Sequence, residues 1–415
     1  MKTIEIDGAT SGPSPRREGF TRHAVTVTYA GSLYPAEQVW FEVPDNLATD
    51  LPTSGDPWLA AMLPLAVTLG RPLIVKLPVD RVLFEGAHRL MALWTQWYPE
   101  LRPVAIETDL TEPAGDPSAE GLTALLFSGG VDSSYTLLSS ENKAGLVVDE
   151  LLLIHGFDIS IDRQDAFDAV CQRLSKTIEP LGKPLIAIAS NLRQTRFQDV
   201  NWTDLAHGAF LAAAGLLLSR RLQRVVISSG SHPGHFVPAG THPDTDPLFS
   251  TSRTTIVHFG AGTSRMDKLA FLSEHPAAFH NLRLCYHAET GANCGRCLKC
   301  LIATSILEVM GKLAECQSFP NDRLDLDHLS HIYLVRAHTI FRLIQAYAAQ
   351  NGREDVAEAI EAAFQRTERL NRGPVIGWLS RLRRRYRHHA NLRLVSRTAR
   401  RWLYALGMRL DRIVR

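Results

Sequence analysis

The chain has few cysteines and no long apolar segment. Only six of its 415 residues are cysteine, and no apolar run reaches the ~18 residues that a membrane-spanning helix requires. Residues 1–20 lack the apolar stretch of a secretory signal and carry glycine and proline instead, so we expect an irregular start to the chain. These absences argue against a secreted, disulfide-stabilised protein. We expect a soluble protein of the reducing cytoplasm.

Charge is distributed unevenly along the sequence. The formal net charge is only +2, yet residues 378–415 carry twelve arginines and one acidic residue, Asp411. Apolar residues recur among these arginines at three- and four-residue steps, which predicts one or two basic amphipathic helices in a tail at 372–415. Such a tail could pack on the acidic remainder of the chain, bind nucleic-acid phosphates or a protein, or lie on an anionic membrane surface.

The most informative segment is 125–134, where an apolar run breaks into glycines and hydroxyls and then continues in a helical pattern. This order predicts a buried strand, an anion-binding loop and a helix start. Glycines allow close backbone approach, and hydroxyls together with the free N–H groups of a helix start can hold a phosphate. The predicted binding residues are Ser128, Gly129, Gly130, Val131, Asp132, Ser133 and Ser134.

Asp132 is the exception in this loop because a carboxylate repels a phosphate. We expect it to act through Mg²⁺ lying between the two groups. Much later, Arg265 and Lys268 open a predicted helix, and either could offset the charge that develops on a departing pyrophosphate. A solvated helix start is the alternative for these two cations. Asp132, Ser133 and Lys268 are the predicted catalytic residues.

Four of the six cysteines follow the spacing C-x8-C-x2-C-x2-C. Four thiolates complete a tetrahedral site, and two-residue gaps with Gly295 allow a tight turn that directs the sulfurs at one ion. An iron–sulfur cluster is the alternative, but no Cys-Pro pair closes the run. We therefore favour zinc, held by Cys285, Cys294, Cys297 and Cys300. The neighbouring Arg296 and Lys299 are expected to keep the thiolates ionised.

Apolar patterning divides the chain into several parts. We expect an α/β protein whose central part, 122–284, alternates strands and helices as a doubly wound parallel sheet does. The other predicted parts are an α+β domain of unknown role at 1–110, a Pro/Gly-rich linker at 111–121, the cysteine knuckle at 285–311, a helical region at 312–371 and the tail. A single long helix is expected at 329–349.

Further polar residues fall where the predicted parallel strands end. His155 and Asp158 follow one strand and could contact a nucleotide, although turn formation is an equal alternative. A long loop carries His232, His235, His242, Asp244 and Asp246, a spacing that suits no closed metal site and favours substrate contact or ordinary loop chemistry. Cys171 and Cys316 fall within helical patterns and are expected to pack in the interior.

The loop at 128–133 resembles the SGGxDS signature of the PP-loop ATP pyrophosphatases, which cleave ATP to AMP and pyrophosphate. Combined with the cysteine spacing, residues 122–311 resemble the 7-cyano-7-deazaguanine synthases of that class. The resemblance implies that the loop binds ATP with Mg²⁺ and that the cysteines bind Zn²⁺. It also implies that the enzyme activates a carboxyl or carbonyl oxygen for attack by a nitrogen nucleophile.

The sequence departs from that family at several points. About 120 residues precede the loop, about 100 follow the cysteines, and the His- and Asp-rich loop does not match the family's substrate-facing segment. The acceptor could therefore be a 7-deazaguanine or a macromolecule to be joined to one, and the oligomeric state is open. The alternatives are a tRNA-thiolating enzyme of the same class and a nucleotide-binding interaction protein without catalysis.

Overall fold

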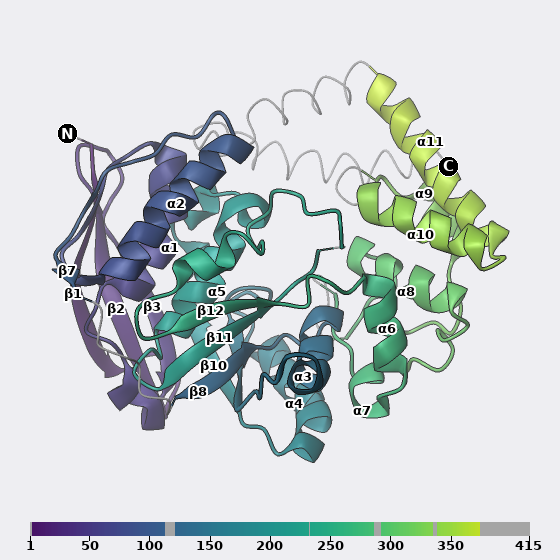
Figure 1. Cartoon of the computed structure of the whole chain (residues 1–415), viewed down its shortest axis with the longest axis horizontal. Coiled ribbons are helices and arrows are strands. Elements are labelled where there is room, and N and C mark those ends of the chain that lie inside the picture. Colours follow the sequence, from purple (N-terminus) through teal and green to yellow (C-terminus); the bar gives the residue numbers. More distant parts are fainter. Residues whose placement is uncertain (1, 113–120, 232, 286–291, 335–337, 374–415) are drawn as a thin grey trace.

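The computed structural model describes residues 2–112, 121–231, 233–285, 292–334 and 338–373 (Figure 1). In this part of the chain, no helix has the length and apolar character needed to cross a membrane. The predicted basic tail lies outside the described residues from 374 onward, and most of the predicted linker, together with His232, lies outside them too.

Ten strands form one sheet. Five of them run parallel, in the spatial order β12 (Thr255–Phe259), β11 (Leu222–Ser228), β8 (Leu122–Leu126), β9 (Glu150–His155) and β10 (Leu185–Ser190). The sheet continues through β3 (Glu37–Pro44), β2 (Phe20–Tyr29), β1 (Ile4–Pro13), β4 (Leu73–Val75) and β6 (Ile106–Glu107). The short strands β5 (Val79–Asp80) and β7 (Leu110–Thr111) pair separately.

The parallel part winds in two directions from β8. The chain passes from β8 outward to β9 and β10, then returns to the other side of β8 for β11 and β12. Ligands of open α/β sheets bind outside the carboxyl ends of the strands at the point where the winding reverses. That point lies between β8 and β11, and the loop at 128–134 follows directly from β8.

Both faces of the parallel strands are covered, as the apolar run of β8 requires. Ala124 and Leu126 belong to a core shared with α1 (Asp56–Leu69), α2 (Arg81–Trp97) and α5 (His207–Leu216). The alternate residues Leu125 and Phe127 belong to a second core. That core is shared with α3 (Val131–Ala144) and α4 (Gln164–Ile178). The sequence prediction of an α/β fold with a mostly parallel sheet is therefore confirmed.

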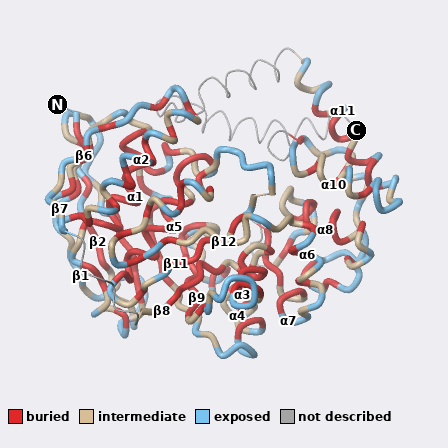
Figure 2. The backbone as a smooth tube through the Cα atoms, in the orientation of Figure 1, coloured by how far each residue is buried: buried red, intermediate tan, exposed pale blue. Residues whose placement is uncertain are grey.

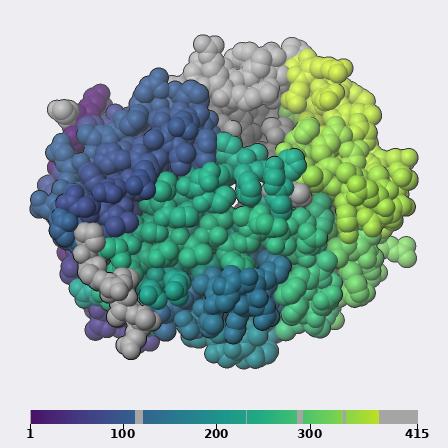
Figure 3. All heavy atoms as spheres, in the orientation of Figure 1, coloured from purple at the N-terminus to yellow at the C-terminus, as the bar shows by residue number. Residues whose placement is uncertain are grey.

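Residues 1–110 contribute to this sheet instead of forming one of their own. β3 pairs antiparallel with β10, placing Phe41 opposite Ser190, and the core around α1 and α2 includes residues of β8, β9 and α5. In the space-filling view the purple and blue N-terminal atoms meet the teal atoms of the central part along a broad boundary (Figure 3). The prediction of an irregular start was wrong, because residues 4–13 form β1.

The remaining helices pack against α3 around a third core, at the side of the sheet (Figures 1 and 2). They are α6 (Arg265–Ser273), α7 (Pro276–Phe279), α8 (Leu298–Val309), α9 (Leu326–His331), α10 (His338–Gln350) and α11 (Glu354–Arg372). Where one helix was expected over 329–349, α9 ends at His331 and α10 begins at His338. Near the sheet, a π-helical turn at Trp202–Ala206 precedes α5.

Candidate functional site: a glycine loop flanked by two sets of cations

The loop after β8 has the expected strand–loop–helix form. Gly129 has a φ of +72°, a value that favours glycine, and a Cβ there would lie 2.2 Å from Cδ2 of Leu174 in α4. The backbone N–H of Ser128 donates to Oγ of Ser133 at 3.3 Å, and Gly130 N–H donates to Oγ of Ser128 at 3.4 Å. These long bonds hold the loop closed over its own hydroxyls, and an anion could replace them.

Two residues of the predicted binding set have side chains that point into the interior. The side chains of Val131 and Ser134 are buried in the first turn of α3, at 1% and 2% exposure. Ser134 N–H is already bonded to the carbonyl of Gly130 at 2.9 Å. The N–H groups at the start of α3 and the side chains of Ser128 and Ser133 are therefore the groups that can meet a ligand.

Asp132 is paired with both predicted cations of α6. Arg265 Nη2 donates to Oδ2 of Asp132 at 2.6 Å, and Lys268 Nζ donates to Oδ1 at 3.1 Å. Lys268 is 1% exposed, and its Nζ also donates to the carbonyl of Ser229 at 2.6 Å. Burial alone raises the pKa of Asp132, but Arg265 and Lys268 outweigh it and hold the pKa below its usual value. The structure thus gives Asp132 a contact that the sequence argument did not predict.

A second set of charges lies on the other side of the loop, where β9 ends. Asp158 forms an ion pair with Arg283 at 3.6 Å. The backbone N–H of Arg283 donates to the carbonyl of Gly129 at 2.8 Å, which ties this residue to the loop. Burial raises the pKa of Asp158, but Lys299 and Arg283 together hold it below its usual value. Lys299 also helps to lower the pKa of Asp132.

His207, at the start of α5, borders the same charges. Burial lowers its pKa to about 4, with Asp158 opposing and Lys299 and Arg193 reinforcing the shift. Its ring lies 5.1 Å from the ring of Trp202, and the guanidinium of Arg193 lies 4.4 Å from that indole. A neutral imidazole beside an indole offers a hydrogen-bonding and stacking surface next to the loop.

The other predicted polar residues take structural roles. His155 is 2% exposed, stacks on Phe167 at 4.3 Å and bonds through Nε2 to the carbonyl of Ser160 at 3.0 Å, so it faces away from the loop. In the His- and Asp-rich loop, Asp246 is fully buried and bonded to His258 at 2.7 Å. The described residues of that loop therefore support the ordinary loop chemistry expected from their spacing.

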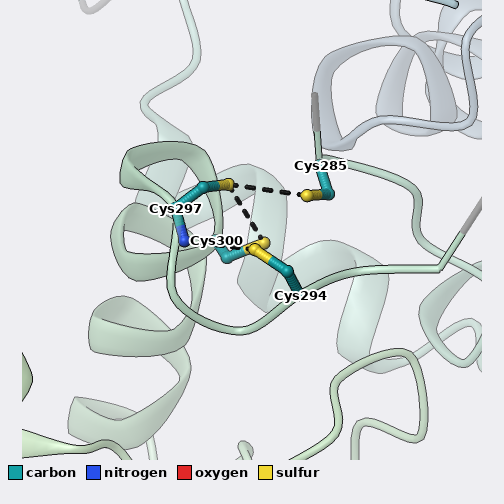
Figure 4. Close-up of side chains that lie close together, drawn as sticks. All are labelled: Cys285, Cys294, Cys297 and Cys300. Atoms are coloured by element: carbon teal, nitrogen blue, oxygen red, sulfur yellow. Dashed lines mark hydrogen bonds between the residues drawn. The ribbon is translucent and has the colours of Figure 1, made fainter. Parts of the chain in front are cut away.

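The four cysteines converge on one point (Figure 4). The sulfur atoms of Cys285, Cys294, Cys297 and Cys300 all lie within 4.8 Å of one another. Cys297 Sγ is 3.7 Å from Cys285 Sγ and 3.5 Å from Cys300 Sγ. Ligand sulfurs on a single tetrahedral ion with a metal–sulfur bond of ~2.3 Å are separated by similar distances. The group could therefore hold a metal such as zinc.

The turn between these cysteines is shaped to receive an ion. The N–H groups of Arg296 and Cys297 point at Sγ of Cys294, at 3.5 and 3.2 Å. Contact between the two thiols lowers the pKa of Cys297 and raises that of Cys300, so Cys297 is the thiol of this pair that ionises first. The guanidinium of Arg296, expected to keep the thiolates ionised, pairs with Asp325 at 3.8 Å.

One buried amide links the cysteines to the glycine loop. Asn293 accepts hydrogen bonds from the N–H groups of Leu284 and Cys285 at 2.8 and 3.1 Å, and it donates to the carbonyl of Leu282 at 2.8 Å. Arg283 lies within this pinned segment and bonds to Gly129. Sequence reasoning missed Asn293, Arg283 and His207 because none belongs to a recognisable spacing.

Comparison with known proteins does not identify the chain. Neither the family models, nor the curated proteins, nor the solved structures contain a match.

Proposed function

We propose that this protein is an ATP-dependent adenylating enzyme that cleaves ATP to AMP and pyrophosphate. One observation carries the proposal: the glycine loop lies where the winding of the sheet reverses, and Arg265 and Lys268, more than 130 residues later, converge on it. A loop of free N–H groups and hydroxyls beside two cations suits a polyphosphate. The resemblance of residues 128–133 to the PP-loop signature supports the same substrate.

In this proposal the chain's own groups act on the leaving pyrophosphate. Arg265 and Lys268 exchange the Asp132 carboxylate for phosphate oxygens when ATP binds. Because Lys268 is buried, its interaction with the charge that develops on pyrophosphate is weakly screened. Ser133 and the first N–H groups of α3 hold the polyphosphate in place.

Asp132 fits a role in binding Mg²⁺. Its carboxylate is charged and 22% exposed, and one carboxylate together with substrate phosphates is a common Mg²⁺ ligand set. In the ligand-free arrangement its two oxygens are shared between Arg265 and Lys268, so the exchange described above would release them. Mg²⁺ would supply charge neutralisation at the phosphates when bound.

For the acceptor we propose a carboxyl or carbonyl oxygen that is adenylated and then attacked by a nitrogen nucleophile. The leading candidate is a 7-deazaguanine carboxylate, or a macromolecule to be joined to one. This part of the proposal is supported by the resemblance over residues 122–311 and by the polar wall of Asp158, His207 and Trp202 beside the loop.

We further propose that the cysteine group holds zinc in a structural role. Four thiolates leave no open position for water, so such a site stabilises the fold without taking part in chemistry. An iron–sulfur cluster binds its ligand sulfurs on separate iron atoms and would hold them farther apart than a single ion does. The separations of 4.8 Å or less favour the single ion.

The test incubates purified protein with ATP, Mg²⁺, 7-carboxy-7-deazaguanine and an ammonium salt as the nitrogen nucleophile, followed by mass spectrometry and nucleotide analysis. The proposal expects AMP, pyrophosphate and an amide or nitrile product. ADP as the product would refute the cleavage chemistry. AMP formation without modification of this acceptor would support an ATP-cleaving enzyme but exclude 7-carboxy-7-deazaguanine as its substrate. No turnover with any acceptor tried, despite ATP binding, would favour a non-catalytic nucleotide-binding protein.

The structure gives little support to the thiolation alternative. A sulfur-carrying cysteine has to reach the loop as a thiolate, and Cys171 is the only cysteine of the central part outside the metal-binding group. Burial raises the pKa of Cys171 to about 11, so its thiol stays protonated at neutral pH. Detection of sulfur transfer from Cys171 to tRNA would reverse this preference.

A further inference from the structure

The guanidinium of Arg283 is buried without an adequate partner. Its side chain is 7% exposed, and its one ion pair among the described residues is with Asp158 at 3.6 Å. Charge-assisted N–H···O bonds are ~2.7–2.9 Å long, so this pair is too long to be one. No other described side chain or carbonyl accepts a bond from the guanidinium, which has five N–H donors. Its nitrogen atoms are not completely buried, so a ligand can still reach these donors.

The backbone of Arg283 is nonetheless firmly held. Its N–H donates a hydrogen bond to the carbonyl of Gly129 in the loop. The side chain of Asn293 forms hydrogen bonds with the backbone of the neighbouring Leu282, Leu284 and Cys285. A side chain on a fixed backbone next to a ligand-binding loop is well placed to receive a ligand group. The unsatisfied donors are therefore not explained by a loosely packed segment.

Charge around Arg283 favours an anion. Asp158 is 30% exposed, and two cations, Arg283 and Lys299, hold it charged. On the far side of the loop, Arg265 and Lys268 share Asp132. Arg283 thus contributes a cation on the Asp158 side of the loop, separate from the two cations that pair with Asp132.

We propose that Arg283, supported by Lys299, binds an oxyanion of the ligand on the Asp158 side of the loop. The planar guanidinium suits two oxygens of one phosphate or carboxylate. The oxyanion is a phosphate of the nucleotide or the carboxylate of the acceptor; naming these sources rests on the proposed function, whereas oxyanion binding itself does not.

The experiment compares Arg283→Gln, Arg283→Lys and a control, Arg342→Gln, in the full-length, metal-loaded protein. Arg342 forms an ordinary surface pair with Glu361 at 2.7 Å, away from the loop. Calorimetry measures the affinity for inorganic pyrophosphate and for AMP, and turnover assays measure KM for 7-carboxy-7-deazaguanine. Loss of a bidentate charged contact is expected to weaken the affected ligand by roughly tenfold to a hundredfold in Arg283→Gln. The affinity of Arg283→Lys should lie between those of the wild type and Arg283→Gln, and the affinity of the control should match that of the wild type.

The two sources give different results. Weaker pyrophosphate or AMP binding assigns the oxyanion to the nucleotide, and this outcome stands even if no AMP is ever formed and the proposed enzyme activity fails. Unchanged affinity for both, with KM for the acceptor raised tenfold or more, assigns it to the acceptor. If neither quantity changes in folded Arg283→Gln, or if the wild type binds none of the three probes, the inference is overturned.

Discussion

Each half of the sheet has a carboxylate paired with two cations, but the two carboxylates differ in their exposure and in the number of hydrogen bonds that they accept. Glu42, on β3, is 1% exposed and accepts hydrogen bonds from Ser14 at 2.6 Å, Arg16 at 3.2 Å and Arg22 at 2.7 Å. Asp132, beside β8, is 22% exposed, and each of its oxygens has a single cationic partner. We call Glu42 the saturated carboxylate and Asp132 the half-open carboxylate, and we expect only the second to exchange its partners for a ligand.

The largest effect is expected at the half-open carboxylate. Asp132→Asn keeps the size of the side chain but removes its charge, so we expect turnover to fall by about 100-fold or more. Rates of AMP and pyrophosphate release measure this loss, and circular dichroism verifies the fold. Unchanged turnover in a folded variant would remove Asp132 from the mechanism.

The cysteine group should control folding. Cys297→Ser removes one of four ligands, and because metal-binding energy doubles as folding energy, we expect metal loss together with insoluble or less stable protein. Elemental analysis and thermal unfolding measure both effects. Cys171→Ser, outside the group, is the matched control and should retain one zinc per chain. Iron in the wild type, with a brown colour after anaerobic purification, would point to a cluster.

The saturated carboxylate should affect stability without affecting ligand binding. Glu42→Gln leaves Arg16 and Arg22 without their counter-charge, so the free energy of unfolding should fall by about 3 kcal/mol. Glu112→Gln, which breaks an exposed pair with Arg81, should change the free energy of unfolding much less. Urea unfolding measures both, and calorimetry with ATP should give wild-type affinity. A Glu42→Gln variant that folds normally but no longer binds ATP would contradict the distinction between Glu42 and Asp132.

The effect confined to the narrowest range of conditions concerns pH. Burial raises the pKa of Asp56, at the start of α1, to about 6. Between its unfolded pKa of ~3.9 and pH 6 the folded protein binds a proton that the unfolded chain releases, so stability falls as pH rises through this window, by up to about 3 kcal/mol. Asp56→Asn should therefore be more stable than the wild type above pH 6, with the difference shrinking towards pH 4. Urea midpoints across this range test it, and a constant difference would contradict the sign.

Local signals in the sequence predicted the parts of the site that are contiguous. The order of residues 125–134 was enough to place strand, loop and helix, and the cysteine spacing was enough to predict four converging sulfurs. Arg265 and Lys268 were found by their place at a helix start. In each case the residues that indicate the chemistry lie within a segment of about fifteen residues.

The missed features depend on contacts between distant segments. Arg283 matters because residues 282–285 lie between the glycine loop and Asn293, and no pattern within 280–285 shows this. The pairing of β3 with β10 was missed for the same reason, and the Pro/Gly-rich segment near 113–120 favoured a domain boundary instead. β1 was missed because only its first residues, such as Ile4 and Ile6, are buried.

The junction of β3 with β10 has a consequence for synthesis of the chain. Phe41 and Ser190 are partners in the sheet, yet about 150 residues separate them. At roughly 5–20 residues per second, the ribosome needs some 8–30 seconds to supply the second strand after the first. During that interval β3 presents an unpaired edge, which is a site for pairing with other chains. In the described sheet only β10 pairs with that edge of β3, so we expect the edge to stay unpaired until β10 emerges.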